Sequence, residues 1–158
     1  MKLAPRIAVI GERDASRTIE SEAEDVGREI ALRGGVLICG GLGGVMEAAA
    51  RGCKAAGGMT IGIIPSTHAE DANPHIVEPI VTGMGEGRNI IIVRSAQAVI
   101  AIGGSYGTLS EIALALRLNI PVIGLHTWTF SRERPAERDS VIRVATAREA
   151  VDSAWSVI

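Results

Sequence analysis

The chain has 158 residues and a formal net charge of −2, with 47% hydrophobic, 22% charged and only 3% aromatic residues. This composition predicts one globular domain over residues 1–158 with an aliphatic core, and it excludes an intrinsically disordered chain. The slightly acidic balance argues against binding to nucleic acid, which requires a positive field, whereas a small anionic ligand requires only local positive potential.

Apolar β-branched runs alternate with stretches of helical periodicity along the chain. Residues 7–10 predict a strand, and Ile19, Ala23, Val26 and Ile30 lie on one face of a helix that Gly34 ends. Further strands are predicted at 36–39 and 60–64, around a helix at 45–53, and residues 66–75 are expected to form a loop. Residues 76–81 predict a strand at the edge of the sheet, because proline is disfavoured in a central strand.

The second half of the chain repeats this alternation. Strands are predicted at 99–102, 121–125 and 141–144, with a helix at 109–116. Thr146 and Glu149 have the spacing of a capping box for a last helix that ends near Val157. Residues 89–93 fit a strand by propensity and a helix by their position after a glycine-rich loop, and periodicity does not separate the two.

Continuous apolar strands that alternate with helices are typical of a parallel sheet covered on both faces. We therefore predict an α/β fold, a Rossmann-like doubly wound parallel sheet in a single domain. No apolar run is long enough to span a bilayer, and the N-terminal residues lack the features of a signal peptide. Because no run spans a bilayer, no membrane partner is expected. Cys39 and Cys53 have the spacing neither of metal ligands nor of a redox motif, which predicts reduced thiols in a cytoplasmic protein.

The first candidate binding motif, GGSYGTLSE at residues 103–111, lies between a predicted strand and a predicted helix. Ligands in open α/β folds bind beyond the carboxyl ends of strands, where a helix N-terminus offers unpaired N–H groups. The motif therefore predicts an anion site. An alternative, compatible interpretation is a tight turn in which Thr108 and Glu111 form a capping box. The binding candidates are Gly103, Gly104, Ser105, Tyr106, Gly107 and Thr108.

A second glycine cluster, GGLGGVME at residues 40–47, occupies the matching position after an earlier strand. Both turns are expected at one edge of the sheet, where they would face one ligand; close helix–strand packing is the alternative interpretation. Neither cluster is a Walker A motif or a dinucleotide fingerprint, so a standard NAD site is not predicted. The candidates here are Gly40, Gly41, Gly43, Gly44 and Glu47.

Arg88 and Asn89 follow a third glycine-rich stretch, and arginine is suited to bidentate contact with phosphate or carboxylate. An ordinary surface arginine is the alternative interpretation. The three histidines form no convincing metal site, and no Ser-His-Asp set is evident. The Arg-rich segment 131–138 is interpreted as a solvated connection.

These motifs together resemble the proteins once named lysine decarboxylases, whose signature is P-G-G-x-G-T-x-x-E. That superfamily includes the LONELY GUY cytokinin-activating phosphoribohydrolases and the molybdenum-cofactor carrier proteins. The resemblance spans most of residues 6–125. In the phosphoribohydrolases the matching turn holds a nucleotide 5′-phosphate, and an Arg and the terminal Glu act on the N-glycosidic bond; the resemblance places these at Arg88 and Glu111.

The chain departs from the hydrolase pattern at three places. Asn89 stands where the hydrolases have Lys, Ile102 stands where they have Pro, and the turn has one extra residue. The chain looks closer to the carrier-protein branch. The resemblance therefore implies binding of a phosphorylated nucleotide or pterin, with molybdopterin or a nucleoside monophosphate as the ligand. The alternatives are a phosphoribohydrolase and a scaffold that does not use its loops.

The helix at 109–116 is apolar on both sides. Leu109, Ile112, Ala113 and Leu116 share one face, and Leu114 and Leu118 lie roughly opposite. A helix that is apolar on both sides is buried on both sides, so one side is expected at a subunit interface. The resemblance also implies a homo-oligomer, either a homodimer or a homotetramer.

Overall fold

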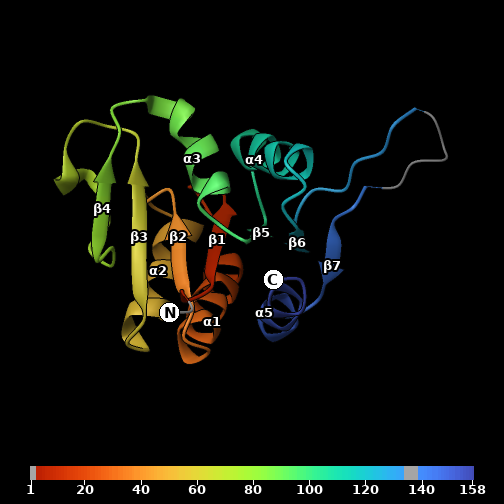
Figure 1. The fold of residues 1–158 in the computed structure, drawn as a ribbon, viewed down its shortest axis with the longest axis horizontal. Helices are drawn as coiled ribbons and strands as arrows, with labels where there is room; N and C mark the ends of the chain where they lie inside the picture. The colour runs from red at the N-terminus through yellow and green to blue at the C-terminus, as the bar shows by residue number, and fades with distance from the viewer. Residues whose placement is uncertain (1–2, 134–138) are drawn as a thin grey trace.

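The apolar runs of the sequence form one parallel sheet in the computed structural model, which describes residues 3–133 and 139–158 (Figure 1). Within these residues the sheet has seven strands in the order β4-β3-β2-β1-β5-β6-β7. The strands are β1 (Arg6–Gly11), β2 (Val36–Cys39), β3 (Met59–Ile64), β4 (Glu78–Val81), β5 (Ala98–Ile102), β6 (Val122–Leu125) and β7 (Ile142–Val144). The predicted α/β fold is confirmed, and the strand with Pro79 lies at an edge.

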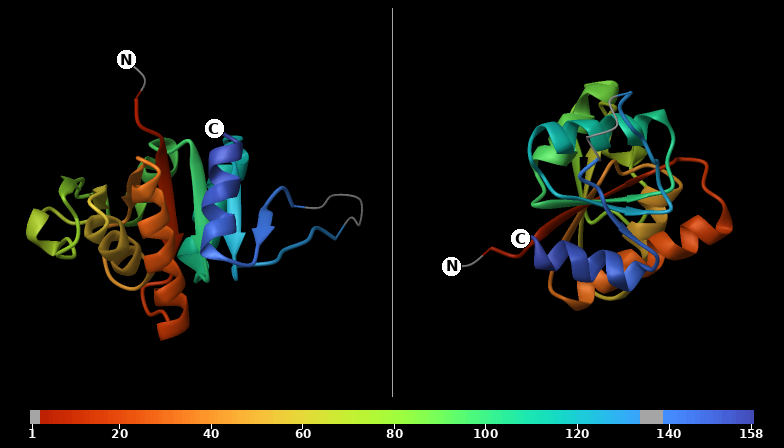
Figure 2. Two further views of the ribbon diagram at one scale, coloured as in Figure 1. Left: turned by 90° about the horizontal axis from the view of Figure 1, so that it is seen from below. Right: turned by 90° about the vertical axis from the view of Figure 1, so that its right-hand side faces the viewer.

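Helices cover both faces of the sheet, which explains why the central strands are apolar on both sides (Figure 2). One buried cluster joins the sheet to α1 (Arg17–Leu32), α2 (Val45–Ala55) and α5 (Ala147–Ser156). A second cluster joins the opposite face to α3 (Asn89–Arg94) and α4 (Tyr106–Arg117). Two short 3-10 helices, η1 (Ala69–Asp71) and η2 (Gly85–Arg88), lie in the connections. None of the described helices combines the length and the apolar character needed to cross a bilayer.

Residues 89–93, which were compatible with either a strand or a helix, belong to α3. The 3-10 turn η2 leads directly into this helix, and Ile92 and Val93 pack into the second cluster. The turn before the segment and its burial against the opposite face of the sheet therefore favour the helix.

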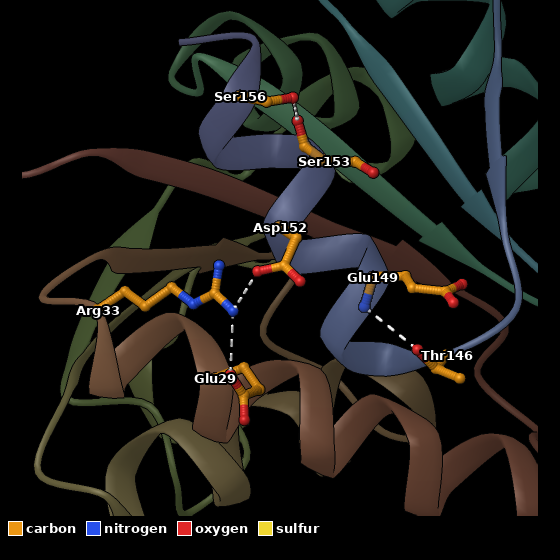
Figure 3. Close-up of polar contacts among 7 residues, drawn as sticks. All are labelled: Glu29, Arg33, Thr146, Glu149, Asp152, Ser153 and Ser156. Atoms are coloured by element: carbon orange, nitrogen blue, oxygen red, sulfur yellow. Dashed lines mark hydrogen bonds and ion pairs between the residues drawn. The ribbon is translucent and has the colours of Figure 1, made fainter.

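The last helix is anchored on α1 by polar contacts (Figure 3). The hydroxyl of Thr146 accepts a bond from the Glu149 N–H (3.2 Å), as the capping-box spacing predicts, and the Glu149 carboxylate accepts one from the Ala145 N–H (2.9 Å). Arg33, the residue just after α1, pairs with Asp152 on α5 (2.6 Å) and also contacts Glu29 on α1 (3.3 Å). These contacts hold α5 against the N-terminal half of the domain.

The faces of α4 differ from the expectation. Ile112 faces the sheet together with Ala115, whereas Ala113 is exposed. Leu114 and Leu118, expected on the opposite side, pack against the second cluster. Leu116 also contacts this cluster, and together with Leu109 and Ala113 it lines a surface groove of about 650 Å³ beside Phe130. The partly exposed face is therefore the one that the helical wheel grouped with Ile112. Residues 134–138 of the Arg-rich segment lie outside the described residues.

Candidate functional site

A cavity of about 320 Å³ with several charged and hydroxyl residues in its lining lies at the carboxyl ends of β1 and β2 and below the β5–α4 turn, on the side of the sheet that α3 and α4 cover. It gathers these predicted residues: Gly40, Arg88, Asn89, Ser105, Gly107, Thr108 and Glu111. The sequence reasoning missed the following lining residues: Gly11, Arg13, Leu42, Met46, Pro65, Gly85 and Glu86. The larger groove on α4 is mainly apolar. Among the described residues, the predicted binding and catalytic side chains that come together do so in the smaller cavity.

Arg88 is held in this cavity by acceptors from three parts of the chain. It ends η2, and only 8% of its surface is exposed. Its Nε donates to the Ile63 carbonyl (2.9 Å), Nη2 donates to the Gly40 carbonyl (3.3 Å), and Nη1 donates to Oδ1 of Asn89. Each terminal nitrogen carries a second N–H that these bonds do not use. The guanidinium is therefore fixed in place and keeps two donors for a ligand.

Glu111 shares the cavity with Arg88 and is 7% exposed. Burial raises the pKa of this carboxyl to about 7, although the Arg88 charge opposes the shift. Burial also lowers the pKa of Arg88, and Glu111 opposes that shift. The predicted capping box is wrong, because α4 begins at Tyr106 after Ser105, which places Thr108 and Glu111 inside the helix. The carboxyl of Glu111 is therefore free of a capping bond to the backbone.

Thr108 supplies an unused hydroxyl at the same place. It is 2% exposed, and its Oγ1 has no hydrogen-bond partner among the described residues. A threonine in a helix ordinarily satisfies its hydroxyl by bonding a carbonyl one turn earlier. A buried hydroxyl that forms no bond costs free energy, and the residue that carries it lines the cavity.

The turn from β5 to α4 leaves its amides available. Gly103 and Gly104 adopt φ angles of 56° and 131°, a conformation suited to glycine, and the Gly103 N–H is bonded to the Leu125 carbonyl (3.1 Å). The first bond of the helix runs from the Leu109 N–H to the Ser105 carbonyl (3.0 Å). The N–H groups before Leu109 therefore lie ahead of the helical ladder, at its positive end.

The turn from β2 to α2 is filled by its own chain. The first N–H of α2, from Val45, donates to the Glu12 carbonyl (3.0 Å). A side chain on Gly44 would lie 2.2 Å from the Arg13 carbonyl oxygen, and Gly44 has a φ of 65°. Asn73 bonds the carbonyls of Gly41 (2.8 Å) and Leu42 (2.9 Å). Of the glycines in this turn, only Gly40 lines the cavity.

Several other predicted binding residues lie outside the cavity. The residues of the β2–α2 turn that do not line it are Gly41, Gly43, Gly44 and Glu47. At Gly41 and Gly44 a side chain would clash with neighbouring atoms, as the close-packing interpretation expects. Tyr106 is 81% exposed and stacks at a tilt near Trp128, with ring centroids 5.5 Å apart. Gly103 and Gly104 line a second hollow. Among the described residues, no group of three His, Cys, Asp or Glu side chains is placed to hold a metal ion.

The parallel sheet, with a cavity beyond its strand ends, defines a Rossmann-like α/β protein. Residues 4–151 match the SLOG cluster4 family, and the chain belongs to that family. The resemblance to the superfamily of the LONELY GUY enzymes and the molybdenum-cofactor carriers is thereby confirmed.

Similar proteins come from both branches of this superfamily. The structure of the molybdenum cofactor binding protein of Rippkaea orientalis has a TM-score of 0.89 and 35% identity, covering 99% of each chain. A molybdenum cofactor carrier protein of Chlamydomonas reinhardtii has a TM-score of 0.84 and 31% identity, covering 98% of each chain. The cytokinin riboside 5′-monophosphate phosphoribohydrolase of Mycobacterium tuberculosis is 39% identical over 57% of this chain, which spans 50% of that enzyme's length.

Proposed function

We propose that this protein binds a phosphorylated nucleotide or pterin, with the phosphate at the β5–α4 turn. The observation that carries the proposal is that three kinds of unused donor meet at one cavity. They are the amides before Leu109, the hydroxyl of Thr108 and the two remaining N–H groups of Arg88. Amide, hydroxyl and guanidinium donors together match the oxygens of a phosphate.

Molybdopterin and a nucleoside monophosphate both fit this donor set, because each carries a phosphate on a heterocycle. The full-length similarity to the molybdenum cofactor binding protein of Rippkaea orientalis supports the pterin. Arg13, which also lines the cavity, adds a second positive charge. The protein's part in this function is to hold the phosphate and to orient the rest of the ligand across the strand ends.

Calorimetric titration with AMP, GMP, ribose 5-phosphate and molybdopterin tests the proposal, using two matched alanine variants. A Cβ on Gly107 would meet no atom closer than 3.8 Å, and one on Gly43 none closer than 3.9 Å, so both Gly107→Ala and Gly43→Ala leave room for folding. Only Gly107 lines the cavity. We expect Gly107→Ala to weaken binding at least tenfold and Gly43→Ala to preserve it. Absence of binding by all four compounds to the unmodified protein would overturn the proposal.

Glu111 supports a second candidate function, hydrolysis of a nucleoside 5′-monophosphate. Its carboxyl lies beside Arg88 with a pKa of about 7, and carboxyls with shifted pKa values are typical general bases. Glu111 would take a proton from water as the water oxygen bonds to C1′ of the ribose. The C1′–N bond breaks as this new bond forms, with oxocarbenium character at C1′, and the departing base nitrogen acquires a proton. The products would be the free base and ribose 5-phosphate.

Chromatographic assay of the free base from AMP and from cytokinin nucleotides separates the two candidates. An enzyme of this type would release base, and Glu111→Ala would abolish the release. Binding of AMP without any release would leave the carrier function and reject the hydrolase. Release that survives in Glu111→Ala would reject the mechanism.

We also propose self-association through the apolar groove on α4. Leu109, Ala113 and Leu116 expose this face. Sedimentation of the unmodified protein is expected to show a dimer or tetramer, and Ala113→Glu is expected to shift it toward monomer. A monomer at micromolar concentration would contradict this.

A further inference from the structure

A second hollow of about 340 Å³ adjoins the β5–α4 turn, and neither candidate function above uses it. Its lining residues are Glu12, Ile19, Gly103, Gly104, His126, Thr127 and Trp128. At two places in the chain, one residue lines the first cavity and its neighbour in sequence lines the second hollow. Gly11 lines the first cavity and Glu12 the second, and Ser105 lines the first cavity while Gly104 lines the second. The two hollows therefore lie on either side of the same glycine turn.

The Glu12 carboxylate lies directly against this turn. Its Oε1 is 2.6 Å from the position that a Cβ on Gly103 would occupy. Glu12 forms no side-chain hydrogen bond or ion pair with any described residue. An ionised carboxylate only accepts hydrogen bonds, so this partly exposed group is open to donors from water or from a ligand.

Other acceptors around the hollow also lack donors. His126 has a φ of 51°, which is a strained conformation outside glycine, and its Nε2 lies 3.2 Å from Oε1 of Glu22. The other oxygen of Glu22, Oε2, is buried without a partner, and so is Oγ1 of Thr127. The contact with Glu22, which itself does not line the hollow, thus holds the strained His126 at its wall, next to Thr127.

We propose that this hollow is a second subsite, which binds the N–H edge of a 2-amino-4-oxo heterocycle, the edge that guanine and pterins share. The proposal rests on the proposed function, because the phosphate of the same ligand occupies the first cavity. The Glu12 carboxylate accepts the ring N–H and one N–H of the exocyclic amine, in a paired geometry that resembles its contact with arginine. Adenine has no such pair of donors on its ring edge.

The remaining wall of the hollow fits a flat ring. Trp128 is the aromatic residue of the lining, and its indole N–H is bonded to the Ser105 carbonyl at 3.1 Å, which fixes its orientation beside Tyr106. Gly103 and Gly104 have no side chains at the ridge between the two hollows. The ligand therefore crosses the turn at its glycines, with the phosphate on the α4 side and the ring against Glu12.

Calorimetric titration with GMP, AMP, ribose 5-phosphate and guanosine tests this subsite. We expect GMP to bind at least tenfold more tightly than AMP, because hydrogen bonds to a charged acceptor discriminate strongly. Glu12→Gln should remove most of this preference and leave the affinity for ribose 5-phosphate unchanged. Glu70→Gln, at an exposed position on η1, should keep the preference and serves as the control.

The possible outcomes separate the subsite from the proposed function. Equal binding of GMP and AMP, or a preference for GMP that survives in Glu12→Gln, overturns the subsite while the phosphate site stands. Failure of every phosphorylated probe, together with binding of guanosine that depends on Glu12, overturns the phosphate site and supports the subsite. Failure of guanosine and of all phosphorylated probes overturns both.

Discussion

The two glycine turns of this protein have similar sequences and different neighbours. Both follow a buried strand and begin a helix, but the β5–α4 turn leaves its amides to the cavity, whereas the first amide of α2 is bonded to the Glu12 carbonyl. Gly44 leaves room for a backbone carbonyl, that of Arg13, whereas Gly104 leaves room for the Thr108 side chain and also borders the second hollow. A glycine cluster at a strand end is therefore as consistent with close packing of the backbone as with ligand binding. A turn against which backbone carbonyls pack has a packing role, and a turn without such carbonyls keeps its amides for a ligand.

Substitution of Gly44 tests the packing role and should have the largest effect on folding. Gly44→Ala places a Cβ 2.2 Å from the Arg13 carbonyl oxygen at a φ of 65°. We expect the free energy of unfolding to fall by at least about 3 kcal/mol, or the protein not to fold. Gly43→Ala, at the adjacent position with open space, should change it by less than about 1 kcal/mol. Urea denaturation compares the two, and equal losses would show that the β2–α2 turn is not packed as described.

The buried carboxyl of α4 should make stability depend on pH. The pKa of Glu111 is raised from 4.5 to about 7 in the folded protein, so the folded state holds a proton that the unfolded state has released. Stability is therefore lost as pH rises from 4.5 to 7, by roughly 3 kcal/mol at most. Relative to the unmodified protein, Glu111→Gln should gain about this much between pH 4 and pH 8 in urea denaturation. Parallel pH profiles for the two proteins would contradict the burial of an ionisable Glu111.

The smallest expected effect concerns the unused hydroxyl of the β5–α4 turn. Thr108→Val removes a buried hydroxyl that has no partner, so the free energy of unfolding should rise by about 1 kcal/mol while phosphate binding weakens. Thr60 is a matched control, because its buried hydroxyl donates to the His75 carbonyl (2.7 Å) and accepts from the Val77 N–H (2.9 Å). Thr60→Val should therefore lose about 1–3 kcal/mol. Thermal unfolding of both variants without ligand measures the contrast, and loss of stability in Thr108→Val would mean that its hydroxyl is bonded.

Much of the fold follows from local patterns in the sequence. The buried runs before Gly11 and after Ala98 predict central strands because apolar residues without alternation require cover on both faces. The helix cap at Thr146 is likewise visible from two residues three positions apart, Thr146 and Glu149. Residues 89–93 were ambiguous because a short apolar run fits either period, and the preceding turn η2 decides it.

The candidate site was only partly predictable. Arg88 and Glu111 meet in one cavity, as the resemblance implied, although no spacing in the sequence shows their proximity. Arg13 was missed because it lies in a polar loop after β1 without a motif of its own. The difference between the two glycine turns depends on the Glu12 and Arg13 carbonyls, which come from more than thirty positions earlier than Val45 and carry no signal in residue type.

The hydrogen bond from the Val45 N–H to the Glu12 carbonyl links the walls of the two hollows. It holds the loop after β1 against the start of α2, while Asn73 and Arg88 hold the chain near Gly40. The walls of the cavity are thus braced by the protein before any ligand arrives, and little conformational entropy is left to lose on binding. For the ligand proposed above, selectivity would then arise from fit to walls that are already in place rather than from closure around it.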